Sequence, residues 1–334
     1  MIIGRNSNFS FLPSNEPYAI IQIVKTIIAV DIGGTQLRVA VYPEHGIKPI
    51  AQKRIPTVGP GTAVERLIGL IEDLWPKDND VLAISAGAPG QVDPEEGVII
   101  AAPNIAGWVD IHLKRELEDR FHVPSFLNND ANLAALGEWR FGAAQGHHNI
   151  LYVTVSTGIG GGVILNDHLL LGKHGLATEV GHVVINPDGP MCGCGKQGHL
   201  EAFASGTAIA HYFNGELKKG RSSSLPADCP HDAREIGKAA KTGDPLALET
   251  YKRAGYYMGI GLANYLHLFN PSIVVIGGGV SRSGDIFWQP MRAAIDLFVL
   301  SDSYTKDLKI LPAALGDDCG LLGALALAHT HLNL

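Results

Sequence analysis

The stretch TIIAVDIGGTQLRVAVYPEHG (residues 26–46) contains an apolar run, two glycines and a second apolar run. Residues on both sides of Gly33 and Gly34 alternate in the manner of strands, so the stretch predicts a β-hairpin with a glycine turn. Glycines leave backbone N–H groups open to an anion, Thr35 adds a hydroxyl, and Asp31 is suited to hold hydrated Mg²⁺. A glycine turn with no role beyond the turn itself has the same sequence.

The same pattern returns in LYVTVSTGIGGGVIL (residues 151–165), where two apolar strands are separated by a Thr/Gly turn of Thr157, Gly158, Gly160, Gly161 and Gly162. The chain therefore looks internally duplicated, and two opposed turns would clamp phosphate groups. A third glycine run, residues 277–279, follows the strand pattern SIVVIG and precedes a helix pattern. In α/β folds this is a position for nucleotide binding, although a plain strand-to-helix turn explains it as well.

Strand and helix patterns alternate along the chain, which is typical of α/β proteins. Besides the hairpins, we expect strands at residues 81–90, 124–130, 272–280 and 308–315, and helices at 62–75, 111–120, 131–142, 200–213, 245–268, 286–300 and from 317. We predict a short N-terminal extension (1–26), a small α/β lobe (27–130 plus 315–334) and a large α/β lobe (131–314). The terminal helix would then pack back on the first lobe.

Composition excludes several classes of protein. With 334 residues, 46% of them hydrophobic and 18% charged, the chain is expected to form two globular lobes. A net charge of -7, from 26 Lys and Arg against 33 Asp and Glu, argues against nucleic acid or an anionic membrane as a partner. No apolar run approaches the roughly 20 residues of a membrane helix, the N-terminus lacks a secretion signal, and four cysteines form no disulfide framework. We therefore expect a reducing, cytoplasmic location.

The segment Asn128-Asn129-Asp130 ends a predicted strand and opens a predicted helix. Asp130 is either the residue that caps this helix or a carboxylate directed into a cleft. A helix N-terminus favours the charged carboxylate, so we expect the pKa of Asp130 to be lowered. For phosphoryl transfer a weak base suffices, because the proton of the attacking hydroxyl is accepted late.

Four potential zinc ligands, His182, Cys192, Cys194 and His199, lie within eighteen residues. Two sulfurs and two nitrogens satisfy tetrahedral zinc, and the short Cys-Gly-Cys spacing suits a tight loop around one ion. Because four protein ligands close such a site, the zinc would be structural. The alternative is a pair of reduced free thiols. Glu179 and Glu201 flank this loop, either as acceptors for hydroxyl groups or as ordinary surface charges.

These motifs resemble the ROK family of bacterial sugar kinases and repressors, from about Ile27 to the C-terminus. VSTGIGGGVILNDHLLLGKHGLATEVGH (residues 155–182) agrees with the long glycine signature of that family, and the metal loop has its spacing. One departure is His199, where the family usually has a third cysteine. The resemblance implies an actin-like, hexokinase-like (ribonuclease H-like) duplicated α/β fold, with two lobes around a central cleft.

The resemblance also implies roles for individual residues. The ATP site would use Asp31, Gly33, Gly34, Thr35, Thr157, Gly158, Gly277, Gly278 and Gly279. The sugar site would use Gly87, Pro89, Gly90, Asn104, Asn129, Asp130, Glu179, His182 and Glu201, with Asp130 as the catalytic base. Structural zinc would be held by His182, Cys192, Cys194 and His199.

The implied activity is transfer of the γ-phosphoryl group of Mg-ATP to the 6-hydroxyl of a hexose, with glucose as the first choice. N-acetylmannosamine, fructose, mannose and allose are alternative substrates, and a homodimer or homotetramer is expected by resemblance alone. A sugar-sensing transcriptional regulator is the alternative from another class. It is disfavoured because only about 26 residues, with one Arg and one Lys, precede the first strand in this sequence, and a helix-turn-helix does not fit there.

Overall fold

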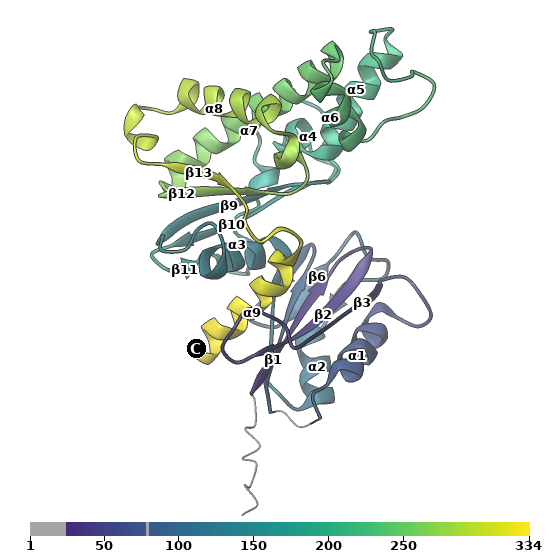
Figure 1. Ribbon diagram of the computed structural model, residues 1–334, viewed down its shortest axis with the longest axis vertical. Coiled ribbons are helices and arrows are strands. Elements are labelled where there is room, and N and C mark those ends of the chain that lie inside the picture. The colour runs from purple at the N-terminus through teal and green to yellow at the C-terminus, as the bar shows by residue number, and fades with distance from the viewer. Residues whose placement is uncertain (1–24, 78–79) are drawn as a thin grey trace, which may run out of the picture.

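The structure is a computed structural model that describes residues 25–77 and 80–334 (Figure 1). Of the predicted N-terminal extension, only Lys25 and Thr26 fall within this range, and the first strand already begins at Thr26. The remainder of the extension lies outside the described residues. The described residues contain two five-stranded sheets. In Figure 1 the first sheet lies in the lower part of the molecule, and the second lies near the middle with helices above it.

The first sheet has the strand order β3-β2-β1-β4-β8. Its strands are β1 (Thr26–Ile32), β2 (Gln36–Pro43), β3 (Ala51–Pro56), β4 (Val81–Ala88) and β8 (Ser125–Asn129). β1 and β2 pair antiparallel around Gly33 and Gly34, which confirms the first predicted hairpin. β4 and β8 run parallel to β1, and helices α1 (Ala63–Leu74) and α2 (Leu113–Phe121) bury apolar side chains against this sheet.

The second sheet repeats this arrangement in the order β11-β10-β9-β12-β13. Its strands are β9 (Asn149–Val155), β10 (Ile159–Leu165), β11 (His168–Leu169), β12 (Ile273–Gly277) and β13 (Lys309–Pro312). β9 and β10 form the second predicted hairpin, and β12 and β13 run parallel to β9. The same order of antiparallel and then parallel neighbours confirms the predicted duplication.

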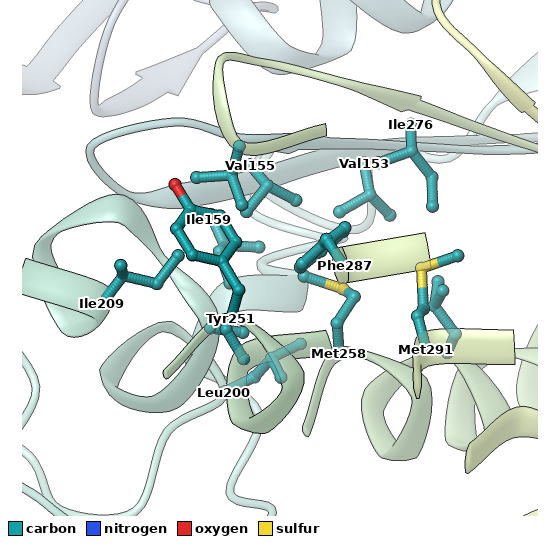
Figure 2. Packing of buried hydrophobic residues seen from close by; sticks show 14 of the residues in the cluster. Val153, Val155, Ile159, Leu200, Ile209, Tyr251, Met258, Ile276, Phe287 and Met291 are labelled. Carbon is teal, nitrogen blue, oxygen red and sulfur yellow. The ribbon is translucent and has the colours of Figure 1, made fainter. Parts of the chain in front are cut away.

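Five helices accompany the second sheet. They are α4 (Glu201–Ala204), α5 (Gly206–Lys218), α6 (Ala233–Lys241), α7 (Pro245–Phe269) and α8 (Asp285–Phe298). Figure 2 shows Val153 and Ile276 of this sheet in one packed cluster with Met258, Phe287 and Met291 of the helices. Burial of these large side chains is the main source of stability in this half of the molecule.

Two helices, α3 (Asp130–Phe141) and α9 (Cys319–Leu332), lie between the two sheets (Figure 1). One buried apolar cluster joins both helices to Ile27 of the first sheet and Ile150 of the second. The helices approach closely at glycines: a Cβ on Gly323 would lie 2.1 Å from the backbone oxygen of Leu133. α9 also packs against β1 and β4, as expected for the terminal helix.

The structure differs from the sequence expectation in several elements. The helix expected at residues 200–213 is two helices, because Ser205 is extended and its Oγ accepts a hydrogen bond from Ala208 N at the start of α5. β3, α6 and a small sheet of β5 (Gln91–Asp93), β6 (Val98–Ala101) and β7 (Val109–Ile111) were not predicted. α6 has nine residues and a single large apolar side chain, Ile236, so its apolar face is made mostly of small residues, although the Asp232/Glu235 capping box marks the start of this helix.

Within residues 25–77 and 80–334, we find no helix that combines the length and the apolar character needed to cross a lipid bilayer.

Candidate active site

The carboxyl ends of three parallel strands bring predicted site residues to one edge of the first sheet. Asp31 on β1 pairs in register with Gly87 on β4, and Gly87 pairs with Asn128 on β8. The residues that follow these strands therefore lie at the same edge. Asn129 donates a hydrogen bond from Nδ2 to the backbone oxygen of Gly90, at 2.7 Å, which joins the loop after β4 to the start of α3.

Asp130 is the first residue of α3, but it is not the cap. Asn129 caps the helix, because its Oδ1 accepts a hydrogen bond from Ala131 N at 2.9 Å. This leaves the carboxylate of Asp130 directed to a cavity of about 60 Å³ that Gly90, Asn129 and Glu179 also line. Of the two alternatives that the sequence left open, the structure favours the cleft-facing carboxylate.

The expectation that the pKa of Asp130 is lowered is wrong. Solvent reaches Asp130 from the cleft, but protein encloses it on the other sides, and this burial raises the pKa of Asp130 to about 6. The hydrogen bond from Ala131 opposes the change, whereas the negative charges of Asp31 and Glu179 reinforce it. Burial together with two like charges outweighs the helix N-terminus. A carboxylate with a pKa near 6 is a stronger base than one of ordinary pKa.

The first glycine turn is held by residues of its own lobe. Thr57 donates from Oγ1 to the backbone oxygen of Gly33 at 2.6 Å and from N to that of Thr35 at 2.9 Å. A Cβ on Gly34 would lie 3.0 Å from the backbone oxygen of Asn104, so this turn closely contacts a residue that is predicted to bind the sugar. Asp31, at the entrance to the turn, lies 3.4 Å from Nη1 of Arg38.

The second glycine turn is held by the start of α5. Gly206 N donates to the backbone oxygen of Ser156 at 2.7 Å, and Thr207 Oγ1 donates to that of Thr157 at 2.9 Å. Glu201 lies directly beneath the turn, since a Cβ on Gly158 would lie 2.5 Å from its Oε2. This oxygen accepts a hydrogen bond from Ile159 N at 2.9 Å.

The remaining glycines of the second run form part of a strand that packs against α3. Gly160, Gly161 and Gly162 belong to β10 rather than to the turn. A Cβ on Gly162 would lie 2.7 Å from Cβ of Ala135, and one on Gly160 would lie 3.1 Å from Cβ of Ala131. These glycines therefore let α3 pack directly on β10, which places Asp130 beside the second turn.

A cavity of about 710 Å³ lies beyond the second turn, between α5, α6 and the short 3-10 helix Val280–Ser283. Of the third glycine run, only Gly279 lines it. Gly277 is buried in β12, and Gly278 has a φ of +85° and packs on the backbone of Val155. The cations that line this cavity, which sequence analysis missed, are Arg234, Lys238, Lys241 and Arg282.

A second large cavity, of about 640 Å³, lies between Asn104 of the first lobe and the metal loop of the second. His182, Glu201 and Gly158 line it, and Thr157 lines both large cavities. Most of the residues predicted to bind the sugar thus line either this cavity or the small cavity at Asp130. Gly87 and Pro89 are buried and line neither, since a Cβ on Gly87 would lie 2.7 Å from Leu133 Cδ1.

The four predicted metal ligands converge on one point. One donor atom each of His182, Cys192, Cys194 and His199 lies within 4.8 Å of all the others. Nδ1 of His182 is 3.3 Å from Nδ1 of His199 and 3.8 Å from Sγ of Cys192, and Sγ of Cys194 is 3.3 Å from Nδ1 of His199. Tetrahedral zinc, with bonds of about 2.0 Å to nitrogen and about 2.3 Å to sulfur, has ligand edges of about 3.3 to 3.8 Å. The donor set therefore fits zinc.

Glu179 precedes the 3-10 helix Val180–His182, at the wall of the small cavity. It is exposed to the cleft on one side and enclosed by protein on the other, and this burial raises its pKa. His182 opposes the change and Glu201 reinforces it. Glu179 is thus electrostatically connected both to Asp130 and to the metal loop.

Comparisons with known proteins agree with this geometry. The chain matches the ROK family over residues 27–331. It is 37% identical over 313 residues to a glucokinase of Thermotoga maritima, covering 92% of this chain and 98% of that protein. The crystal structure of a ROK hexokinase from Thermus thermophilus is 36% identical with a TM-score of 0.79, covering 92% of this chain and 99% of the other.

A second solved structure is a ROK family glucokinase from Streptomyces griseus in complex with glucose and AMPPNP. It is 35% identical, has a TM-score of 0.76, and covers 91% of this chain and 99% of its own. The actin-like, hexokinase-like fold predicted from the resemblance is therefore confirmed. A match over nearly the whole chain, with both glycine hairpins and the His/Cys loop in place, leaves one assignment: the protein is a member of the ROK family.

Proposed function

We propose that the protein is an ATP-dependent hexose kinase that phosphorylates the 6-hydroxyl of glucose. The observation that carries the proposal is the position of Asp130, whose carboxylate faces the cleft next to the second glycine turn and has a pKa of about 6. A base of this kind orients the attacking hydroxyl and takes its proton as the new P–O bond forms. The bond between the γ-phosphorus and the bridging oxygen breaks, and ADP leaves.

The large cationic cavity is where we place the nucleotide. Its lining by Thr157 and Gly279 connects a phosphate turn to the end of β12, and Lys238 and Arg282 supply positive charge for phosphate groups. Asp31 and the first glycine turn, residues 33–35, would complete the phosphate site from the other lobe. Asp31 is suited to hold the hydrated Mg²⁺ that accompanies ATP.

The sugar is placed against Asp130 and between the two lobes. Asn104, Asn129 and Glu179 offer amide and carboxylate groups, which match the alternating donors and acceptors of a hexose ring. The cavity at Asp130 is about 60 Å³, smaller than a hexose, so the sugar must also use the adjoining cleft. Closure of the lobes over the sugar would exclude water, an alternative acceptor for the phosphoryl group.

His182, Cys192, Cys194 and His199 would hold a structural zinc ion, which would order the loop and leave no open coordination position. Because the ligand edges involve Nδ1 of His182, its Nε2 remains for the 640 Å³ cavity that His182 lines. We therefore propose that His182 connects the metal loop to a sugar hydroxyl, so that loss of metal also weakens sugar binding.

The test is ADP release from Mg-ATP by the purified protein with a panel of sugars: glucose, mannose, fructose, allose and N-acetylmannosamine. We expect the highest kcat/KM with glucose. A higher kcat/KM with another sugar would correct the substrate. Glucose binding without turnover of any sugar would contradict the kinase and favour a sugar sensor.

A further inference from the structure

The chain passes between the two sheets twice. It leaves the first sheet through β8, α3 and the loop at residues 142–148, and it returns from β13 through residues 313–318 into α9. In Figure 1 the return segment runs from β13 of the second sheet to α9, which lies beside the first sheet. Glu138, on α3, lies where these two crossings meet and is completely buried.

Both carboxylate oxygens of Glu138 accept hydrogen bonds from backbone N–H groups. Oε2 accepts from Ala143 N, in the outgoing crossing, at 2.8 Å. Oε1 accepts from Ala314 N and from Leu315 N, in the return crossing, each at 2.9 Å. One side chain therefore holds three N–H groups from two segments that are about 170 residues apart in the sequence.

Local structure does not account for a carboxylate at this position. Glu138 lies in the last turns of α3, where the partial negative charge of the helix C-terminus disfavours another negative charge. Burial of a carboxylate is costly unless hydrogen bonds replace its water. The three N–H groups of the crossings supply these hydrogen bonds. Glu138 therefore stabilises the connection between the lobes rather than the helix that carries it.

The return crossing continues from Glu138 to the first phosphate turn. After Leu315 the chain reaches Asp317, whose backbone oxygen accepts from Nη1 of Arg38, and Asp318, whose Oδ1 lies 3.0 Å from Nη2 of Arg38. Arg38 in turn pairs with Asp31. A Cβ on Gly320, in the first turn of α9, would lie 2.7 Å from the carboxylate of Asp31. The position of Asp31 is thus coupled to the return crossing.

In the other direction, α3 carries Asp130 at its N-terminus, eight residues before Glu138 and about 12 Å along the helix axis. A helix of this length moves as a rigid body. Glu138 is therefore connected to the proposed base through α3 and to the proposed phosphate and Mg²⁺ site through the return crossing.

We propose that Glu138 is a positioning residue that fixes α3 to the return crossing, so that Asp130 and Asp31 keep one relative geometry as the cleft closes. This inference deepens the proposed kinase function and rests on it. Glu138 touches no substrate, so it should act on the rate of the chemical step and not on substrate affinity. A displacement of about 1 Å at a reacting group is able to cost about a hundredfold in rate.

The test is Glu138→Gln, which keeps the size of the side chain but replaces one accepting oxygen by an NH₂ group that faces an N–H donor. We expect kcat for glucose to fall about tenfold to a hundredfold, with KM for glucose and ATP within about twofold of the unaltered protein. The matched control is Asp244→Asn. Asp244 is also a buried carboxylate, and it accepts from Ser224 N and Ala247 N within the second lobe only.

A milder pair of variants covers the case in which Glu138→Gln does not fold. Gly316, in the return crossing, has a φ of +56°, and Gly243, near Asp244, has a φ of +93°; a Cβ on either would meet nothing within 4 Å. Gly316→Ala and Gly243→Ala therefore introduce similar backbone strain without a clash. We expect a loss of kcat only in Gly316→Ala, measured well below the melting temperature of each variant.

Equal kcat values in Glu138→Gln and Asp244→Asn, or a change in KM without a change in kcat, would overturn the positioning role. If the unaltered protein turns over no sugar, the proposed function fails instead, and the two failures are distinguished by this measurement.

Discussion

The two five-stranded sheets have the same strand order, but they carry different chemistry at the corresponding edge. In the first sheet, Asp31 lies near the end of β1 and Asp130 directly follows β8. In the second sheet, β9 ends at Val155 and β13 is followed by Ala313, both uncharged. The duplication thus provides the same geometry twice, whereas the charges differ. Carboxylates gather on the first sheet, and cations such as Lys238 line the cavity beside the second.

This difference has an electrostatic consequence. Burial raises the pKa of Asp130, and the nearby carboxylates of Asp31 and Glu179 raise it further. The repeated strand order does not by itself require these charges. The cations lie on the side where phosphate groups are proposed to bind. A cleft with a base on one side and positive charge on the other suits transfer of an anionic group to a hydroxyl.

The largest expected effect comes from removal of the carboxylate that distinguishes the first sheet. Asp130→Asn should lower kcat about a thousandfold, because the amide does not accept the proton of the sugar hydroxyl. Glucose binding, measured by calorimetry, should remain within about fivefold, since the amide still hydrogen-bonds a hydroxyl. Asp296→Asn, an exposed residue of α8, is the control. If Asp130→Asn kept most of the activity, Asp130 would not be the catalytic base.

The next largest effect is expected from loss of a ligand in the metal loop, which belongs to the half of the molecule that contains the second sheet. Cys194→Ser should reduce the zinc content from about one ion per chain to none and raise KM for glucose about tenfold to a hundredfold, because His182 loses its anchor. Zinc is measured by atomic absorption. Cys229→Ser, at an exposed cysteine outside the loop, should leave both values unchanged. Loss of zinc without a change in KM for glucose would show that the metal does not support sugar binding.

The pH dependence of activity tests the side of the cleft that carries Asp130. Because the pKa of Asp130 is raised to about 6 and the base must be ionised, kcat/KM should be constant above this pH. It should fall about tenfold per pH unit below it, as the carboxylate is protonated. The profile of Asp130→Asn should lack this acidic limb. A limb near pH 4 in the unaltered protein would show that burial and the charges of Asp31 and Glu179 do not raise the pKa of Asp130.

The smallest expected effect tests the cations of the second half. Lys238→Ala should raise KM for ATP about fivefold and leave KM for glucose unchanged, because Lys238 lines only the cavity proposed for the nucleotide. The effect should weaken at high ionic strength. Lys252→Ala, on the exposed face of α7, serves as the control. An equal change in both variants would indicate general electrostatic attraction rather than a local contact.

Much of the fold follows from local pattern. The glycine pairs between apolar runs predict both hairpins, and the His/Cys spacing predicts the ligand set, because each depends on residues near one another in the sequence. Other features depend on distant partners. Ser205 interrupts a helical pattern because Gly206 binds the backbone of Ser156, about 50 residues away. The glycines of β10 look like a phosphate loop, yet they serve the packing of α3.

Backbone freedom, side-chain periodicity and short spacing set the alternation of strands and helices, the two glycine turns and the four donors of the metal loop. These features can therefore be predicted without the structure. Three features depend on how distant segments pack: which of the proposed sugar-binding residues share a cavity, that the pKa of Asp130 is raised rather than lowered, and that Glu138 joins the two crossings. Burial and like-charge repulsion act through space. Their sign at a given residue depends on which distant segments surround it.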